Sequence, residues 1–332
     1  MGPDTGDEYV STGHLPSPRQ VQDAVDEAYR MYHPEASGEV SQTYPALAQV
    51  PGDLFGICVA GISGGIYRAG DTRHEFAIMS VAKPFVFALV SEALGDEPVR
   101  RKLGVNATGL PFNSLAFVER SPDGWSNPMV NAGAIAATSL VPGNSGTAKW
   151  RFLSGGLSHF AGRDLALSQE IYASASAANH TNRAIASLLA SRSLIYCDPA
   201  EAVDLYTRQS WLLTTAEDLA VMSATLADGG VNPVTGLRVV TAGVCQDTLA
   251  VMATAGMYET SGDWLFDVGV PGKSGVGGGI IAVSPGKGGL GTFSPLLDRA
   301  GNSVRGQLAA RHLSRTLGLS LFASKPDRSS IG

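Results

Sequence analysis

The sequence predicts an α+β fold in which both ends of the chain build one mixed or antiparallel sheet, flanked by helices, while the middle forms an inserted, mostly helical lobe. Strand patterns occur near the start of the chain and again near its end, whereas residues 80–249 are rich in alanine and leucine with helical periodicity. A lone hairpin at either end would be only marginally stable, so the two strand regions are expected to share a sheet. We therefore expect a sheet lobe from residues 1–90 and 250–332 and a helical lobe from residues 91–249.

Individual elements follow from the spacing of apolar residues. Residues 18–32 have helical spacing, and the apolar run 54–60, a glycine-containing turn and the run 66–68 predict a hairpin. In the middle of the chain, helices are expected at 132–140, 182–191, 199–209 and 215–227. Towards the end, strands are expected at 275–283 and 289–294, followed by a closing helix at 301–319.

The composition indicates a folded enzyme with a small-molecule substrate. The 332 residues are 44% apolar and 16% charged, with a net charge of −6 and no basic cluster that would bind a phosphate backbone. The sequence has no apolar run of about 18 residues, and residues 1–8 contain neither a basic nor an apolar segment suited to export. We therefore expect no nucleic-acid partner, no membrane partner and a cytoplasmic location.

Metal and nucleotide motifs are not evident in the sequence. The three cysteines and six histidines are scattered, with no pair at ligand spacing and no histidine-based triad. Gly272-Lys273-Ser274 is similar to the end of a phosphate-binding loop, but that motif needs a glycine where this chain has Asp267. We therefore expect neither a catalytic metal nor a nucleotide site.

Ser80-Val81-Ala82-Lys83 is the strongest candidate for a catalytic motif. Three residues apart on a helix, Ser80 and Lys83 lie on the same face, where the amine can take the hydroxyl proton. This reaction requires a neutral amine, and the apolar flanks of the motif are expected to lower the pKa of Lys83 by desolvation. A second positive charge, from Lys273 in the late Lys273-Ser274-Gly275 motif, is expected to act in the same direction.

The motif alone leaves two interpretations open. Ser80 is either a nucleophile or an ordinary serine at the start of a surface helix. Ser284-Pro285-Gly286-Lys287 has the same spacing, but its proline and glycine disfavour a helix, so we interpret it as a turn. Pro84 is compatible with a helix from Ser80, because a proline in the first turn removes a donor that has little or no helical partner.

The order of the motifs, with Ser-x-x-Lys on an early helix and Lys-Ser-Gly on a late edge strand, resembles the serine β-lactamase and penicillin-binding protein architecture. Longer phrases resemble the serine-dependent glutaminase family, namely Asn127-Pro128-Met129-Val130-Asn131-Ala132-Gly133-Ala134-Ile135, Gly256-Met257-Tyr258, Lys273-Ser274-Gly275-Val276-Gly277-Gly278-Gly279 and Gly301-Asn302-Ser303-Val304-Arg305-Gly306. The similarity extends from about residue 21 to about residue 319. It implies a serine β-lactamase-like fold and hydrolysis of L-glutamine to L-glutamate and ammonia through an acyl-serine intermediate. It also implies no metal or organic cofactor, and a homo-oligomer, either a dimer or a tetramer.

The resemblance also implies roles for individual residues. Ser80 corresponds to the family nucleophile, Lys83 to its general base, and Tyr258 to a tyrosine that relays a proton or binds the substrate. Further substrate-binding positions correspond to Asn131, Asn182 and Tyr206, and the backbone N–H groups of Ser80 and Val276 correspond to the oxyanion hole. Without the resemblance, helix capping is the favoured interpretation of both asparagines, and packing in the core is an alternative role for both tyrosines.

Three positions depart from the family pattern, and all three concern substrate recognition. Ala175 stands where a glutamate meets the substrate α-ammonium, Met79 where a glutamine precedes the nucleophile, and Thr43 where the lid has a tyrosine. Leaving an ammonium without a partner in a closed pocket is costly. Glutamine is therefore expected to bind poorly unless another group compensates for Ala175.

Three alternatives to glutamine hydrolysis stay open. The first is a related serine amidohydrolase whose altered substrate lacks the free α-ammonium. The second is a catalytically impaired binding protein, in which no acylating reagent would label Ser80. The third is a β-lactam-reactive enzyme, although the middle of the chain follows the glutaminase phrases rather than a Ser-Asp-Asn pattern.

Overall fold

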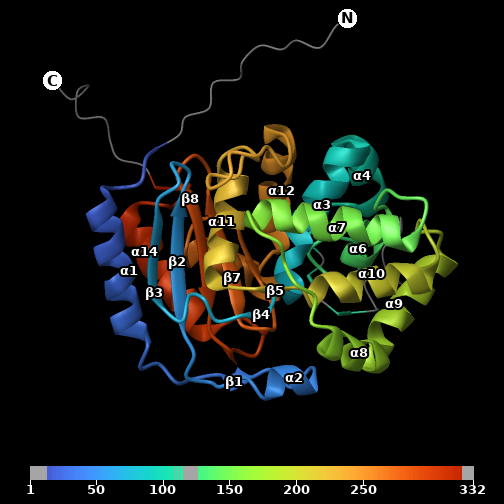
Figure 1. The fold of residues 1–332 in the computed structure, drawn as a ribbon, viewed down its shortest axis with the longest axis horizontal. Coiled ribbons are helices and arrows are strands. Elements are labelled where there is room, and N and C mark those ends of the chain that lie inside the picture. The colour runs from blue at the N-terminus through green and yellow to red at the C-terminus, as the bar shows by residue number, and fades with distance from the viewer. Residues whose placement is uncertain (1–12, 108, 112, 115–125, 324–332) are drawn as a thin grey trace, which may run out of the picture.

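The computed structural model describes residues 13–107, 109–111, 113–114 and 126–323 (Figure 1). A five-stranded antiparallel sheet with the order β3-β2-β8-β7-β6 forms its main layer. The strands are β2 (Gly56–Gly61), β3 (Ile66–Gly70), β6 (Gly272–Ser274), β7 (Gly279–Ser284) and β8 (Gly288–Phe293). Because β2 pairs directly with β8, the two ends of the chain share one sheet, which confirms the predicted fold class.

Helices cover both faces of this sheet (Figure 1). Val59 of β2 lies in a core shared with α1 (Pro18–Tyr32) and α14 (Val304–Leu317). Its neighbour Ala60 packs instead against α11 (Ala216–Ala227) on the other face. This alternation is the two-residue period of a strand that is buried on both sides.

Glycines in β8 allow α11 to approach the sheet closely. A Cβ at Gly289 would lie 2.3 Å from the Cβ of Ser223, and a Cβ at Gly291 would lie 2.3 Å from the carbonyl oxygen of Ala216. No side chain fits at these distances, so only glycine is compatible with the helix position. Although α11 packs on the sheet, it belongs to segment 91–249, and the division of the chain into two lobes stays a prediction.

Most of the remaining helices gather beside the sheet around α3 (Ala82–Leu94) (Figure 1). They are α4 (Asp96–Leu103), α6 (Asn131–Ser139), α7 (Gly146–Ala161), α8 (Gln169–Ala178), α9 (His180–Ser191), α10 (Pro199–Ser210) and α12 (Ala242–Ala255). Residues 82–91 of α3 are all buried, and α3 contacts α4, α6, α7 and α12. A helix buried on every face is typical of the centre of a helical core. The helix that carries Lys83 is therefore enclosed by its neighbours along its first ten residues.

The predicted helices and strands are confirmed, with some differences at their ends. The expected strand at 275–283 is wrong in its first four residues, because 275–278 form a turn and β7 begins at Gly279. The closing helix begins at Val304 rather than residue 301, because the Ser303 side chain accepts a hydrogen bond from Gly306 N and so caps the first turn.

Several elements are too short for a periodicity analysis to find. Strand β4 (Phe76–Ala77) pairs with β5 (Leu213–Thr214) and leads into η1 (Met79–Val81), a single 3-10 turn that precedes α3. Strand β1 (Glu39–Val40) pairs with β9 (Leu296–Leu297) at the lower edge of Figure 1. The others are α2 (Pro45–Ala48), η2 (Tyr258–Thr260) and α13 (Ser261–Asp267).

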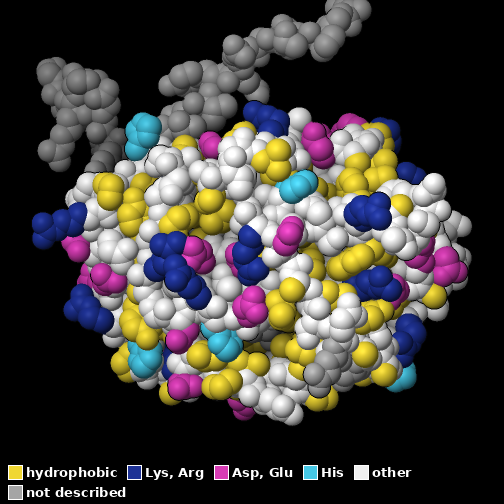
Figure 2. Space-filling model, in the orientation of Figure 1, with side chains coloured by type: hydrophobic (Ala, Val, Ile, Leu, Met, Phe, Trp, Pro, Cys, Tyr) yellow, Lys and Arg dark blue, Asp and Glu magenta, His cyan; other side chains and the backbone are white. Residues whose placement is uncertain are grey.

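The surface carries charges of both signs. On the face shown in Figure 2, lysine and arginine side chains are dispersed among aspartate and glutamate side chains. This distribution agrees with the modest net charge of −6. Among the described residues, no helix is both long enough and apolar enough to cross a membrane.

Arg305 connects α14 to the segment that precedes β2. Its side chain, in a residue only 5% exposed, donates hydrogen bonds to the carbonyl oxygens of Glu35 and of residues 52–54. We expect Arg305→Met to lower the free energy of unfolding by about 2–4 kcal/mol, because these oxygens lose a charged donor. Urea denaturation measures the change. Arg315→Met, at an exposed position of the same helix, is the control, and an equal loss in both variants would contradict the prediction.

Candidate active site

Ser80 lies in η1, where the edge of the sheet meets the helices. The turn after β6 passes close to it, because a Cβ on Gly275 would lie 3.3 Å from Ser80 N and a Cβ on Gly277 would lie 2.8 Å from the carbonyl oxygen of Ala77. Glycine at both positions allows this close contact between backbones. The late Lys273-Ser274-Gly275 motif therefore approaches Ser80 from the side opposite α3, as the sequence predicts.

The backbone is strained at two residues beside Ser80. Met79, which precedes Ser80, and Tyr258, whose hydroxyl is hydrogen-bonded to Ser80, have φ angles of 49° and 57°. A left-handed conformation at a residue other than glycine costs about 1–3 kcal/mol and persists only where the surroundings impose it. Both residues are buried, and this combination is typical of functional sites.

The Lys83 amine is buried one helical turn after Ser80. Its Nζ donates hydrogen bonds to Asn131 Oδ1 at 2.7 Å and to the Met129 carbonyl oxygen at 3.4 Å. Burial lowers the pKa of Lys83 to about 7, because removal from water disfavours the charged amine. Burial, rather than the charge of Lys273, is therefore the main cause of the lowered value. Much of the amine is neutral near pH 7, as a general base requires.

Tyr258 and Lys273 form the other side of the site. The Tyr258 hydroxyl donates a hydrogen bond to the Ser274 carbonyl oxygen at 2.9 Å and is also hydrogen-bonded to the Ser80 side chain. Lys273 Nζ lies 4.2 Å from the centroid of the Tyr258 ring and donates to the carbonyl oxygens of Gly256 and Ser274. Burial raises the pKa of Tyr258, so its hydroxyl stays protonated. Burial, and next the charge of Lys83, lower the pKa of Lys273 well below its usual range.

A cavity of about 60 Å³ lies in front of Ser80. Five of the predicted site residues line it, namely Ser80, Asn131, Asn182, Tyr206 and Val276, together with the departures Thr43 and Met79. Sequence reasoning missed five lining residues, which are Tyr44, Asn179, Thr207, Ser210 and Trp211. A helical step of three or four residues, from Asn182 back to Asn179 and from Tyr206 on to Ser210, is the signal that was available for two of them.

One wall of the cavity is a polar network. Asn131 Oδ1 accepts hydrogen bonds from Lys83 and from the Tyr206 hydroxyl at 3.1 Å, while Asn131 Nδ2 donates to Asn182 Oδ1 at 3.2 Å. The capping interpretation is wrong for both asparagines, because Val130 and Asn179 occupy the N-cap positions of α6 and α9. Tyr206 packs in the core and also joins the network through its hydroxyl.

Another part of the wall is apolar, around Met79 and Trp211, and Ala175 is not among the described residues that line the cavity. Ala175, 2% exposed, belongs to the same buried cluster as Met79 and Trp211. The ring of Tyr44 packs edge-on against Trp211, with 5.2 Å between the ring centroids. None of the described residues that line the cavity is an aspartate or glutamate, so none of them supplies the carboxylate that the family pattern places at position 175. The described part of the chain also contains no group of three or more His, Cys, Asp or Glu that could hold a metal ion.

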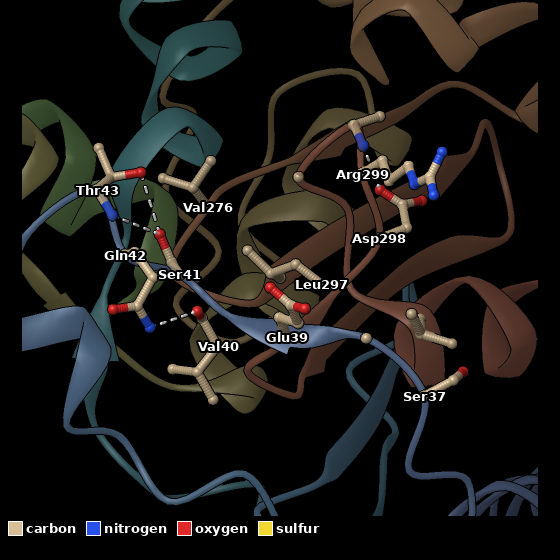
Figure 3. Close-up of a pocket in the computed structure, with 14 residues that line it drawn as sticks. Ser37, Glu39, Val40, Ser41, Gln42, Thr43, Val276, Leu297, Asp298 and Arg299 are labelled. Atoms are coloured by element: carbon tan, nitrogen blue, oxygen red, sulfur yellow. Dashed lines mark hydrogen bonds between the residues drawn. The ribbon is translucent and has the colours of Figure 1, made fainter.

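A larger cavity of about 830 Å³ adjoins the first, because Thr43 and Val276 line both. In Figure 3, Thr43 lies beside Val276 and is held by hydrogen bonds to Ser41 at 3.2 and 3.4 Å. Residues 37–43 and 297–301 form the walls of this outer cavity. The departure at Thr43 therefore stands at the boundary between the Ser80 cavity and the outer cavity.

The antiparallel sheet, the Ser-x-x-Lys helix and the Lys-Ser-Gly edge strand together define the serine β-lactamase-like fold. A family model described as glutaminase matches residues 38–322. The chain therefore belongs to the glutaminase family.

Curated relatives and solved structures agree with this assignment. Glutaminase 2 of Yersinia pestis is 60% identical over 319 residues, which cover 96% of this chain and 94% of the relative. The glutaminase of Mycobacterium marinum is 48% identical over 303 residues, covering 91% and 95% respectively. The solved structure of the probable glutaminase ybaS has a TM-score of 0.91 at 44% identity and covers 92% of this chain and 99% of that one. The structure of Mglu in its glutamate form has a TM-score of 0.87 at 36% identity, with coverage of 94% and 71%.

Proposed function

We propose that this protein hydrolyses L-glutamine to L-glutamate and ammonia, with Ser80 as nucleophile and Lys83 as general base. The observation that carries the proposal is the buried amine of Lys83, one turn from Ser80, with its pKa lowered to about 7. Membership of the glutaminase family supports the substrate. It also favours glutamine hydrolysis over an altered-substrate amidohydrolase, a binding protein or a β-lactam-reactive enzyme.

In the proposed reaction, Lys83 takes the hydroxyl proton of Ser80 as Ser80 Oγ attacks the side-chain amide carbon of glutamine. The backbone N–H groups of Ser80 and Val276 stabilise the negative charge that develops on the amide oxygen. Tyr258 gives its hydroxyl proton to the amide nitrogen and takes the proton held by Lys83, and the C–N bond breaks so that ammonia leaves and the acyl-serine remains. Water then attacks the acyl-serine with Lys83 again acting as base, Lys83 returns that proton to Ser80 Oγ as the ester bond breaks, and glutamate is released.

Substrate recognition is divided between the two walls of the cavity. Asn131 and Asn182 each use one N–H of the side-chain amide in the polar network, which leaves the other N–H for substrate oxygens. The substrate α-ammonium meets the apolar wall around Met79 and has no carboxylate partner at position 175. Weak binding of glutamine is therefore part of the proposal. A homo-oligomeric state, dimer or tetramer, and a cytoplasmic location stay predictions from the sequence.

The first test is ammonia release from L-glutamine at concentrations up to tens of millimolar. Wild-type protein should show saturable release, and Ser80→Ala should lose at least about 1,000-fold in kcat because no acyl-enzyme can form. The variant also controls for contaminating activity. Equal release by wild type and Ser80→Ala would exclude Ser80 as the nucleophile.

The pH dependence of the reaction should report the titration of Lys83. Protonated Lys83 cannot accept the Ser80 proton, so kcat/KM should fall about tenfold per pH unit well below pH 7 and level off above it. Initial rates from about pH 5 to pH 9 measure this profile. A profile that is flat between pH 5 and pH 8 would contradict the assignment of Lys83 as the base.

Ala175→Glu should improve the binding of glutamine. The new carboxylate would pair with the substrate α-ammonium, and we expect KM to fall about tenfold or more with a smaller change in kcat. Ala173→Glu, at an exposed position of the same helix, is the matched control. Glutaramate, the glutamine analogue that lacks the α-ammonium, should show no such improvement. An unchanged KM for glutamine in Ala175→Glu would contradict the idea that Ala175 weakens binding by leaving the α-ammonium without a carboxylate partner.

A further inference from the structure

Three asparagine side chains, Asn131, Asn182 and Asn179, continue the hydrogen bonding of Lys83 along the cavity that Ser80 lines. Lys83 Nζ donates to Asn131 Oδ1 at 2.7 Å, and Asn131 Nδ2 donates to Asn182 Oδ1 at 3.2 Å. Asn182 Nδ2 donates in turn to Asn179 Oδ1 at 2.6 Å. Each step between two asparagines uses an amide N–H of one residue and an amide oxygen of the next, so this asparagine chain has a direction.

The hydrogen-bonded asparagine chain ends on α10, at Thr207. Asn179 Nδ2 donates to Thr207 Oγ1 at 2.7 Å, and the Thr207 hydroxyl donates to the Val203 carbonyl oxygen at 2.6 Å, one turn earlier on the same helix. Asn179 and Thr207 are each only 4% exposed. Neither residue has a role in the proposed reaction so far.

The Val203 carbonyl fixes the direction of the whole chain. A carbonyl oxygen only accepts, so the single hydrogen of the Thr207 hydroxyl is used there, and Thr207 Oγ1 is left as an acceptor. Asn179 must then present its NH2 group to Thr207, which turns its oxygen towards Asn182. The same constraint passes through Asn182 to Asn131. Because these side chains are buried, a reversed amide would place two donors or two acceptors against each other.

At the other end of the asparagine chain, Asn131 turns its amide oxygen rather than its NH2 group towards Lys83. A neutral amine has two N–H groups and one lone pair, and acceptors at Asn131 Oδ1 and the Met129 carbonyl oxygen engage both N–H groups. The lone pair is then available for the hydroxyl proton of Ser80. If the amides were reversed, Asn131 Nδ2 would donate into this lone pair and compete with Ser80.

We propose that Thr207 and Asn179 are positioning residues that fix the amide orientation of Asn182 and Asn131 and thereby keep the lone pair of Lys83 directed at Ser80. The proposal rests on the proposed role of Lys83 as general base. Thr207 and Asn179 act through the asparagine chain and need not touch the substrate.

Thr207→Val tests the proposal, because valine has nearly the same shape but no hydroxyl. We expect kcat for glutamine to fall about tenfold, since about nine-tenths of the molecules would have reversed amides. Thr207→Ser restores the hydroxyl and should recover most of the lost activity. Thr225→Val is the matched control, because Thr225 is buried and makes the same bond to a carbonyl one turn back, but on α11 and outside the chain.

A second measurement separates positioning from a general structural effect. An oxygen facing Lys83 favours its charged form, so reversal of the amides should lower the pKa of Lys83. In Thr207→Val, the decrease of kcat at low pH (the acid limb) should occur at lower pH than in the wild type. The midpoint of the Lys83 titration, measured by NMR of ¹³C-labelled lysine, should also move to lower pH. In Thr225→Val, neither should change. The NMR titration needs no activity. If the wild type shows no Ser80-dependent ammonia release, the proposed function is wrong, but the NMR titration still tests whether Thr207 fixes the orientation of the asparagine amides.

Two results would overturn the proposal. One is a Thr207→Val variant whose kcat and acid limb match the wild type, and the other is a rise in KM alone. If Thr207→Val does not fold, Asn179→Asp and Asn179→Leu provide the same comparison. Aspartate at 179 still accepts from Asn182 and should retain activity at about pH 9, where Lys83 is neutral, whereas leucine should not. Equal loss in both variants would also exclude the proposal.

Discussion

The candidate site depends on the burial of one amine. A pKa of about 7 for Lys83, against an ordinary value of 10.5, corresponds to roughly 5 kcal/mol by which the surroundings disfavour its charge. A single neighbouring side chain rarely supplies an effect of this size, whereas removal from water does. The complete burial of residues 82–91 in α3, surrounded by helices, is therefore what makes a lysine usable as a base here. The helices packed around α3 therefore stabilise the fold and also lower the pKa of Lys83.

The same packing maintains strain next to Ser80. Met79 and Tyr258 are held at positive φ, and glycines at 275 and 277 bring a second backbone against η1. A conformation that costs about 1–3 kcal/mol at each of two residues survives only because α3 and β6 are fixed by their own burial. Ser80 is consequently held between two rigid segments. This arrangement is suited to a reaction whose oxyanion donors must be in place before the charge develops.

Much of the fold and part of the site follow from the sequence, and the limits have a physical origin. The helix at 18–32 and the hairpin around residue 63 were predictable because their signals are local. Ser80 and Lys83 could be found from their motif, and Asn131 and Asn182 only from the resemblance to the family. The hydrogen bond between Asn179 and Thr207 could not be predicted, because it joins residues 28 apart in the sequence and exists only once α9 and α10 pack together. The two-residue strands were missed for the same reason, since pairing rather than periodicity defines them.

The contrast between the two walls of the cavity links recognition to catalysis. The wall that carries the hydrogen bonds of Lys83 is polar, whereas the wall around Met79 and Trp211 is apolar and packs in one buried cluster with Ala175. A carboxylate near the cavity would attract the substrate α-ammonium, but it would also favour the protonated form of Lys83 and raise the pKa of the base. An alanine at 175 removes both effects together. In the proposed mechanism, weaker binding of the substrate ammonium and a base that stays neutral at lower pH are therefore two expected consequences of the same departure at 175.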